Sequence, residues 1–305
     1  MPRIVSLIPS ATEIVAVLGF EDDLVGRSHE CDFPTSVRQL PVCTEPKFDL
    51  DGTSYEIEQR VKAILQEAVS VYRVDADRLR QLRPDVIVTQ AQCEVCAVSL
   101  QEVESVVCAW LDSKPQMVSL EATCLADVWE DIGRVAEALG VLAEGADLVA
   151  ELKQRISDIE AATRVLQERP SVVCIEWIEP LMAAGNWLPE QVEMAGGVNL
   201  FGTTGEHSPW MTWEALRDGN PDVIVMLPCG FDIERTRREM PALTERPGWL
   251  ELKAVQNERV YLTDGNQFFN RPGPRLVESL EILAEVLHPG QFDFGHKGMG
   301  WEPFM

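Results

Sequence analysis

Short apolar runs alternate with amphipathic segments along this chain, and the most regular amphipathic segment covers residues 143–169. Its larger apolar side chains recur at helical spacing, at Leu148, Leu152, Ile156, Ile159 and Leu166. The segment contains no proline and consists mostly of good helix formers. We therefore expect one amphipathic helix, roughly 40 Å long at about 1.5 Å per residue.

A similar phrase occurs on each side of this helix. Residues 82–88 read Leu-Arg-Pro-Asp-Val-Ile-Val, and residues 219–225 read Gly-Asn-Pro-Asp-Val-Ile-Val. Both copies follow a short helical segment, and both run into a loop that contains a cysteine, Cys93 or Cys229. The repetition favours two lobes of similar plan. The alternative is that many buried strands begin in this way without any duplication.

The arrangement of strands and helices predicts the α/β fold class. Short runs rich in β-branched residues predict strands over residues 4–8, 86–88, 172–177, 223–225 and 260–262, with helical segments between them. We expect two Rossmann-like lobes, residues 1–142 and 170–290, joined by one long rigid helix over residues 143–169. Residues 291–305 are rich in glycine and are predicted to form a loose tail.

The charge of the chain limits its partners. Fifty acidic and 26 basic residues give a formal net charge of −24. So negative a chain repels nucleic acid and anionic membranes and is a poor match for a polyanionic substrate. We expect no nucleic-acid partner and no insertion into a membrane. An acidic surface also keeps a protein soluble, which is the simpler explanation of the charge.

The amino terminus shows no secretory signal. Its first apolar run, Ile4–Ile8, ends at Pro9 and is too short for a signal-peptide core or a membrane span. If Met1 is the native start, we expect a cytoplasmic protein whose eight cysteines are mostly thiols. A chain from which a signal had been removed would look the same and would be periplasmic.

Aromatic residues gather at the predicted strand ends of the second lobe. Flat apolar side chains with a few polar groups among them suit a large, partly apolar ligand. The candidate ligand-binding residues here are Trp177, Asn186, Trp187, Trp210, Phe231, Asn266, Phe268 and Arg271. The alternative for any single tryptophan is that it seals the core.

The first lobe offers a different set of groups, in two loops that follow predicted strands. The first loop contains His29, Glu30 and Cys31, and the second contains Gln92 and the pair Cys93 and Cys96. His29, Glu30 and Gln92 are candidate ligand contacts. If the loops meet, Cys31, Cys93 and Cys96, with His29 or Cys43, could hold zinc or an iron–sulfur cluster. The alternative is a set of reduced thiols without metal.

No motif of a known catalytic type is present. The chain has no G-x-S-x-G elbow, no glycine-rich phosphate loop and no H-E-x-x-H helix. His288 and His296 lie near the carboxyl end and are expected to be exposed. The sequence therefore favours a binding protein over an enzyme.

Taken together, these segments resemble a known family. The opening run Ile4–Glu13, the Leu-Arg-Pro-Asp-Val-Ile-Val phrase, the long central helix and the run Gly196–Phe201 are similar to the substrate-binding proteins of ABC transporters that have a helical backbone (class III). The cobalamin-binding branch is the nearest, with iron-siderophore binders as cousins. The likeness extends to about Pro289.

The resemblance has several implications. It implies a ligand cleft between the lobes, with Trp177, Trp187 and Trp210 around a corrin ring. It also implies that Asp77 and Glu214, which precede the two copies of the Pro-Asp strand, dock onto arginines of an ABC permease. The chain departs from the periplasmic cobalamin binders in lacking a signal peptide and in carrying the His29 and Cys93 loops. These differences suggest a cytoplasmic branch whose cleft ligates a metal, such as the cobalt of a corrinoid, through His29.

The residues and the resemblance together support two hypotheses. The first is a solute-binding protein for a corrinoid such as cobalamin, or for a related large metal-containing ligand. The alternative is a cytoplasmic metal- or redox-active protein that uses Cys31, Cys93 and Cys96 on a solute-binding fold.

Overall fold

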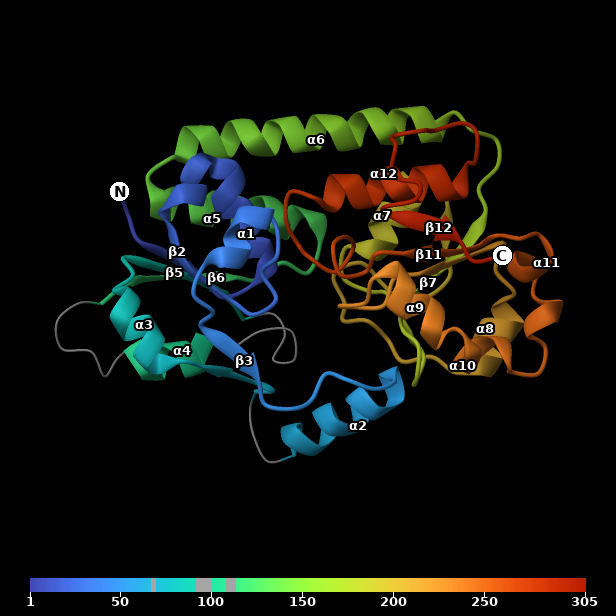
Figure 1. The fold of residues 1–305 in the computed structure, drawn as a ribbon. Helices are drawn as coiled ribbons and strands as arrows, with labels where there is room; N and C mark the ends of the chain where they lie inside the picture. Colours follow the sequence, from blue (N-terminus) through green and yellow to red (C-terminus); the bar gives the residue numbers. More distant parts are fainter. Residues whose placement is uncertain (67–69, 92–99, 108–113) are drawn as a thin grey trace. The chain divides into compact units, whose positions relative to one another are not determined.

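The computed structural model describes residues 1–66, 70–91, 100–107 and 114–305 (Figure 1). The chain forms two compact units, each with its own sheet. The first lobe comprises Met1–Gly52 and Gln59–Glu151, and the second comprises Thr53–Glu58 and Leu152–Met305. The boundary between Glu151 and Leu152 falls inside the unbroken helix α6 (Leu142–Arg164). Each lobe is described by itself below.

The first lobe contains a four-stranded parallel sheet with strand order β2-β1-β5-β6. Its strands are β1 (Ile4–Ser6), β2 (Leu24–Arg27), β5 (Val86–Gln90) and β6 (Gln116–Leu120). A separate antiparallel pair consists of β3 (Thr44–Pro46) and β4 (Tyr72–Val74). The helices are α1 (Pro9–Val15), α2 (Ser54–Leu65), α3 (Ala76–Leu82), α4 (Leu100–Val107) and α5 (Leu125–Leu139), and α2 begins in residues grouped with the second lobe.

The second lobe contains a six-stranded sheet with order β12-β11-β10-β7-β8, in which β9 also pairs with β7. The strands are β7 (Ser171–Trp177), β8 (Met182–Ala183), β9 (Val198–Asn199), β10 (Val223–Met226), β11 (Val260–Thr263) and β12 (Trp301–Pro303). The central strands β7, β10 and β11 are parallel. The helices are α7 (Leu188–Met194), α8 (Trp213–Gly219), α9 (Ile233–Glu239), α10 (Pro241–Thr244), α11 (Lys253–Gln256) and α12 (Leu276–Leu287).

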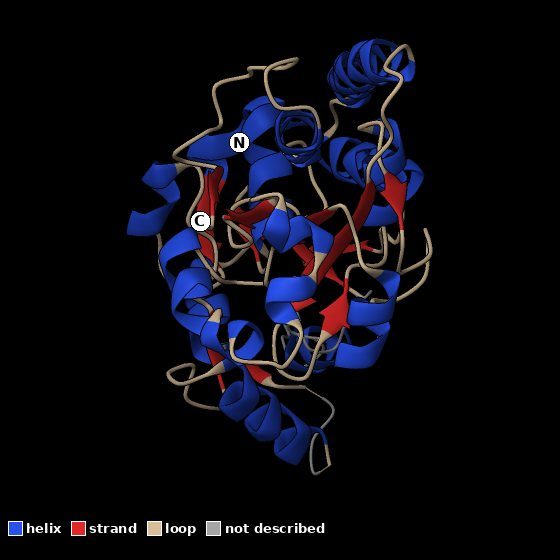
Figure 2. Ribbon diagram, turned by 90° about the vertical axis from the view of Figure 1, so that its right-hand side faces the viewer, coloured by secondary structure: helices blue, strands red, loops and turns tan. Residues whose placement is uncertain are grey.

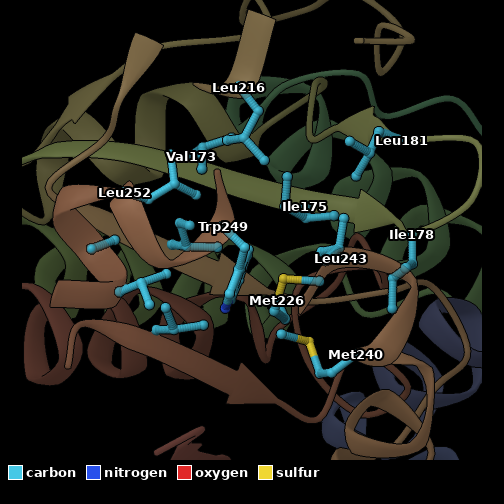
Figure 3. Close-up of a cluster of buried hydrophobic side chains, with 14 of the residues drawn as sticks. Val173, Ile175, Ile178, Leu181, Leu216, Met226, Met240, Leu243, Trp249 and Leu252 are labelled. Atoms are coloured by element: carbon cyan, nitrogen blue, oxygen red, sulfur yellow. The ribbon is translucent and has the colours of Figure 1, made fainter. Parts of the chain in front are cut away.

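Buried apolar side chains of the strands and helices form the core of each lobe. Figure 2 distinguishes the strands from the helices by colour. In the second lobe one buried cluster joins Ile175 of β7 and Met226 of β10 to Leu216 of α8 and to Trp249 (Figure 3). Full burial of such a side chain stabilises a fold by about 1.5–3 kcal/mol. In the described part of the chain, no helix combines the length and apolar composition needed to cross a bilayer.

The repeated phrase folds in the same way in both lobes. The side chain of Asp75 accepts a hydrogen bond from the first turn of α3, and that of Thr212 does so for α8. Each helix ends at a residue in the left-handed region, Arg83 with φ 45° or Asn220 with φ 40°. A proline follows in both copies and prevents the helix from continuing.

An aspartate then ties the repeated strand to the first strand of its lobe. The carboxylate of Asp85 accepts the Arg3 N–H at 2.8 Å, and its own N–H donates to the Arg3 carbonyl at 2.8 Å. Asp222 makes the same pair of bonds with Ser171, at 2.9 and 3.0 Å. The prediction of two lobes of similar plan, joined by one long helix, is confirmed.

The long helix ends earlier than predicted. It was expected over residues 143–169, and α6 covers Leu142–Arg164. The Thr163 hydroxyl, in its last turn, donates to the Met194 carbonyl at 2.6 Å. The main chain then turns, with the Leu166 N–H bonded to the Thr163 carbonyl, and it reaches Pro170 without further helix.

The prediction of a loose tail over residues 291–305 is wrong. Residues Trp301–Pro303 form β12, which pairs antiparallel with β11. The Trp301 indole N–H donates to Glu285 of α12 at 2.5 Å, and Arg237 of α9 pairs with Glu302 at 3.0 Å. The partners lie far away in the sequence, so the local glycine-rich composition gave no sign of them.

The exposure predicted for two histidines is also wrong. His288 is buried, and its Nε2 lies 3.0 Å from the Ala195 carbonyl. His296 is half-buried, and its Nε2 lies 2.8 Å from Oε2 of Glu281, a residue of α12. Both side chains therefore connect the carboxyl-terminal segment to the rest of the second lobe.

Candidate functional site

Aromatic and cationic side chains meet at the carboxyl ends of β7 and β10 in the second lobe. Trp177 is the last residue of β7, and Phe231 lies in the loop after β10. Their ring centroids are 5.2 Å apart at an angle of 52°. The guanidinium of Arg235 lies 4.1 Å from the Phe231 centroid, within the range of a cation–π contact. We call Trp177, Phe231 and Arg235 the aromatic face.

A glycine brings the loop after β11 against this face. A Cβ at Gly265 would lie 2.3 Å from the Pro228 carbonyl oxygen, so only glycine fits. The next residue, Asn266, donates its N–H to the Phe231 carbonyl at 3.1 Å. Arg271 donates to the side-chain oxygen of Asn266 at 3.1 Å. The structure thus brings four predicted residues together, namely Trp177, Phe231, Asn266 and Arg271.

A set of hydrogen bonds fixes the loop that carries Trp210. Ser208 donates to Glu176 of β7 at 2.8 Å and accepts the Gly185 N–H at 3.0 Å. Asn186 sits in the left-handed region with φ 52° and donates its N–H to the Glu206 carbonyl at 2.7 Å. Trp210 itself is 54% exposed. These contacts hold a large apolar side chain open to solvent.

The indole nitrogen of Trp177 is an unusual feature of the aromatic face. Its Nε1 is buried, and among the described residues it has no hydrogen-bond partner. A buried N–H group without a partner typically costs about 1–3 kcal/mol. An acceptor for this indole N–H would therefore have to come from outside the described residues.

Two other predicted aromatic residues are held by contacts within the second lobe, and one of them is buried. Trp187 is 5% exposed, and its indole N–H donates to the Phe269 carbonyl at 2.6 Å. Phe268 packs edge-on against His296, with 6.1 Å between ring centroids, and beside the guanidinium of Arg275. For Trp187, the structure therefore fits the alternative, a tryptophan that seals the core, better than it fits a ligand contact.

In the first lobe, His29 follows β2 and is held by the β3–β4 pair. Its Nδ1 lies 2.8 Å from the Thr44 hydroxyl, and its ring centroid lies 5.0 Å from that of Tyr72. The Tyr72 hydroxyl donates to Glu30 at 3.2 Å. Burial, with a smaller contribution from the charge of Arg27, lowers the pKa of His29 to about 4. The imidazole is therefore neutral at pH 7.

The described cysteines of the first lobe do not form a metal site. Cys31 is fully buried, and the Thr12 hydroxyl donates to its sulfur at 3.0 Å. Burial raises the pKa of Cys43 to about 12, which keeps its sulfur protonated. Gln92, Cys93 and Cys96 lie outside the described residues. Within the ranges that the structure describes, no group of three or more His, Cys, Asp or Glu side chains could hold a metal ion.

The two acidic residues predicted to dock onto a permease occupy equivalent positions. Asp77 and Glu214 each lie in the first turn of their helix, α3 or α8, and both are exposed. A carboxylate near a helix amino terminus is stabilised by the helix dipole. The fold thus presents one carboxylate from each copy of the repeat.

Sequence reasoning missed the residues that complete these sites. Arg235 lies four residues after Phe231, at the start of α9, so helical spacing was a signal that could have indicated their contact. Thr44 and Tyr72 offered no such signal, because the β3–β4 pair brings them to His29 from distant parts of the chain.

Comparisons with known proteins all indicate the same family. The model of the periplasmic binding protein family matches residues 4–266. An uncharacterised ABC transporter substrate-binding lipoprotein, YvrC of Bacillus subtilis, is 25% identical over 95% of this chain and 81% of its own length. The vitamin B12-binding protein of Vibrio cholerae is 22% identical over 95% of this chain and 90% of its own length.

Solved structures show the same fold. A periplasmic heme-binding protein from Pseudomonas aeruginosa superimposes with a TM-score of 0.71 at 21% sequence identity. The match covers 95% of this chain and 94% of that protein. At this level of identity, the likeness supports the α/β fold with two lobes and a helical backbone.

Proposed function

Because the chain belongs to the periplasmic binding protein family, we propose that it binds a corrinoid, or a closely related large metal-containing ligand, as the solute-binding component of an ABC transporter. The observation that carries this proposal is the aromatic face of the second lobe. It combines a Trp177–Phe231 pair, an overlying Arg235 and an indole N–H that has no partner among the described residues. The similarity to vitamin B12-binding proteins supports the same ligand class.

The chemistry of the face suits such a ligand. A corrin is a large ring system with apolar faces and an edge of amide groups. The half-buried Trp177 and the exposed Trp210 can pack against the ring, whereas Phe231 is buried and packs against Trp177. A small movement of Trp177 would let its N–H donate to an amide oxygen at the edge of the ring. Arg235, which lies over Phe231, adds positive charge for an anionic substituent such as a phosphate. The ligand position between the lobes, which the family resemblance implies, stays a prediction.

We propose that the protein has a binding role without catalysis. Substrate-binding proteins act by holding a ligand and presenting it to a transporter, which requires complementary contacts and no reacting group. The buried thiols described above do not favour the metal- or redox-active alternative. Neither zinc nor an iron–sulfur cluster has support among the described residues.

For the transporter partner we propose that Asp77 and Glu214 dock onto cationic residues of an ABC permease. Their equivalent and exposed positions in the repeat support this role, because exposed carboxylates attract the cationic residues of a partner protein. Such docking requires the protein to reach the outer face of the membrane. The docking proposal therefore requires the periplasmic alternative, and the cytoplasmic location expected from the sequence stays a prediction.

The test is a spectroscopic titration of the purified protein with hydroxocobalamin, cyanocobalamin, hemin and a ferric siderophore. Saturable binding of the cobalamins supports the corrinoid assignment. Selective binding of hemin or of the siderophore would keep the solute-binding function and change the ligand. No binding of any of the four would contradict the proposal.

A variant then tests the position of the ligand. Trp210→Ala removes an exposed aromatic side chain and should weaken cobalamin binding roughly 30-fold, the effect of a loss of about 2 kcal/mol. Leu250→Ala, at a side chain of the same lobe that is 75% exposed, is the matched control and should leave binding unchanged. Equal affinities of the two variants would remove Trp210 from the site.

A further inference from the structure

The carboxyl-terminal strap, which we define as residues 289–305, reaches the loop after β11. Its strand β12 pairs with β11, and just beyond that pairing the Asp264 N–H donates to the Gly300 carbonyl at 3.0 Å. The carboxylate of Asp264 accepts the Asn266 N–H at 3.1 Å. The same N–H also donates to the Phe231 carbonyl, so one series of hydrogen bonds runs from the strap to the aromatic face.

The strap also holds α9, the helix whose first turn carries Arg235. The Arg237 guanidinium donates to the Glu302 carboxylate at 3.0 Å and to the Phe304 carbonyl at 3.1 Å. Residues two positions apart lie on different faces of a helix, so Arg235 can reach Phe231 while Arg237 reaches the strap. A shift of the strap would therefore move α9 and the guanidinium over Phe231.

An open hollow of about 420 Å³ lies beside these two attachments. It is lined by the start of α9, by Asp264, and by Met299 and Glu302 of the strap. At this place the strap is linked to its neighbours by individual bonds and not by close packing. Such a link can tighten or loosen without disturbing the packed core.

Buried carboxylates of α12 anchor the strap. Oε2 of Glu281 lies 2.8 Å from Nε2 of His296, and Glu285 accepts the His296 backbone N–H at 3.4 Å. Arg155 of α6 donates to the other oxygen of Glu281 at 2.7 Å. The His296 ring also packs edge-on against Phe268, so it contacts α12 and the loop after β11 together.

The charges around His296 make this anchor sensitive to protonation. The carboxylates that act on it all belong to α12, namely those of Glu278, Glu281 and Glu285. The cations beside these carboxylates are Arg155 and Arg275. The hydrogen bond to Glu281 raises the pKa of His296 above its usual 6.5. A charge-assisted bond of this kind weakens when the imidazole loses its proton.

We propose that the carboxyl-terminal strap positions the aromatic face for the solute, and that His296 is the positioning residue that makes this hold depend on pH. The inference rests on the proposed function, because it assigns the solute to this face. Protonated His296 fixes the strap on α12, and the strap holds the loop after β11 and α9 in place. Loss of the proton loosens the anchor as pH rises through the raised pKa, so the face is less well preorganised.

Titration of the whole chain with cyanocobalamin at several pH values between about 6 and about 9 tests the proposal. Cyanocobalamin keeps its cyanide and its charge over this range, so a change in affinity reports on the protein. The wild-type protein should bind roughly fivefold more tightly at the acidic end. His296→Gln keeps a hydrogen-bond donor near Glu281 and cannot take up a proton. Its affinity should stay near the alkaline wild-type value at every pH.

Two further variants separate positioning from a loss of stability. His288→Gln is the matched control, because it replaces a buried histidine of the same lobe whose pKa is lowered by burial. Its binding should keep the pH dependence of wild type. Arg237→Met removes the bonds from α9 to the strap and should weaken binding at the acidic end roughly fivefold. Urea unfolding of each variant shows that it is folded under the conditions of the titration.

The outcomes distinguish this inference from the proposed function. Equal wild-type affinities across the range, or wild-type pH dependence in His296→Gln, would overturn the positioning role while cyanocobalamin binding still supports the proposed function. Loss of the pH dependence in His288→Gln as well would also overturn it, because affinity would then follow stability in general. Absence of cyanocobalamin binding by the wild-type protein at every pH would overturn the corrinoid assignment, and this inference with it.

Discussion

The two lobes share one structural unit and differ in the loops attached to it. In both, a capped helix ends in a left-handed residue, and an aspartate ties the next strand to the first strand of the lobe. Beyond that point the chemistry diverges. The first lobe presents a neutral histidine held by a two-stranded pair, and the second presents an aromatic face with an arginine over it.

The difference shows how such a fold separates stability from recognition. The repeated unit consists of local hydrogen bonds and buried aliphatic side chains, which any ligand-binding lobe of this plan needs. The strand-end loops carry the groups that differ, and they can change without disturbing the sheet. Substitutions at corresponding residues of the two lobes can test whether stability and recognition are separated in this way.

The largest effect is expected at the buried leucine of each repeated helix. Leu79 and Leu216 occupy equivalent positions, and both are 0% exposed. Either Leu→Ala change removes buried methyl groups and should lower the free energy of unfolding by about 2–5 kcal/mol. Urea unfolding of the two variants measures this. A large loss at one position with little loss at the other would show that the lobes do not share the unit.

The two aspartates that tie each repeated strand to the first strand of its lobe, Asp85 and Asp222, should have a smaller and unequal effect on the free energy of unfolding. Asp222 accepts both the N–H and the hydroxyl of Ser171, while Asp85 is exposed and accepts the Arg3 N–H. We expect Asp222→Ala to cost about 1.5–3 kcal/mol and Asp85→Ala about 0.5–1.5 kcal/mol in unfolding experiments. The Ser171 bonds lower the pKa of Asp222, so its contribution is present at neutral pH and is lost as pH falls below 3.8. A larger cost for Asp85→Ala would contradict this ranking.

Two histidines should give opposite pH dependence in the two lobes. His29 has a pKa lowered from 6.5 to about 4 by burial, so protonation of the unfolded chain lowers stability as pH falls from 6.5 towards 4. The hydrogen bond to Glu281 raises the pKa of His296, so its contribution is full below 6.5 and is lost as pH rises through the raised value.

Unfolding of His29→Gln and His296→Gln at several pH values measures both effects. The first variant should lose less stability than wild type between pH 6.5 and 4. The second should differ most from wild type in acid and least in base. Parallel pH curves for wild type and both variants would contradict the assigned environments.

The smallest effect on stability is expected at the two exposed carboxylates. Asp77→Asn and Glu214→Gln each remove a charge near a helix amino terminus, worth about 0.3–1 kcal/mol. Thermal unfolding should therefore change little for either variant, while ATP-driven uptake by a reconstituted transporter should fall in both. Normal uptake by the double variant would exclude these residues from docking.

The repeat shows how far the sequence could predict the fold. Capping residues, the Pro-Asp phrase and apolar spacing are local signals, and they indicated the α/β lobes and the long helix. The β12 strand depends on Glu285 and Arg237, which are distant in sequence, so its glycine-rich surroundings suggested a loose tail. Pairing with a distant strand leaves no periodic pattern in so short a segment.

The candidate site shows the same limit. Aromatic residues at strand ends pointed to Trp177 and Phe231, which the structure brings together. The same pattern included Trp187, whose burial depends on the Phe269 carbonyl and on packing that composition does not reveal. His29 was selected for its chemistry, whereas its orientation comes from Thr44 and Tyr72 on a strand pair formed over a long separation.

The most direct test of this account is hydrogen–deuterium exchange of the protein with and without saturating hydroxocobalamin. We predict slower exchange in the loop around His29 in the first lobe, and in the loops that carry Trp177 and Phe231 in the second. The amino-terminal turns of α3 and α8 should exchange at unchanged rates, because the proposed docking role places them outside the ligand contacts. Bound hydroxocobalamin that protects none of these loops, or that protects the α3 and α8 turns in their place, would contradict the assignment of ligand contacts to the strand-end loops.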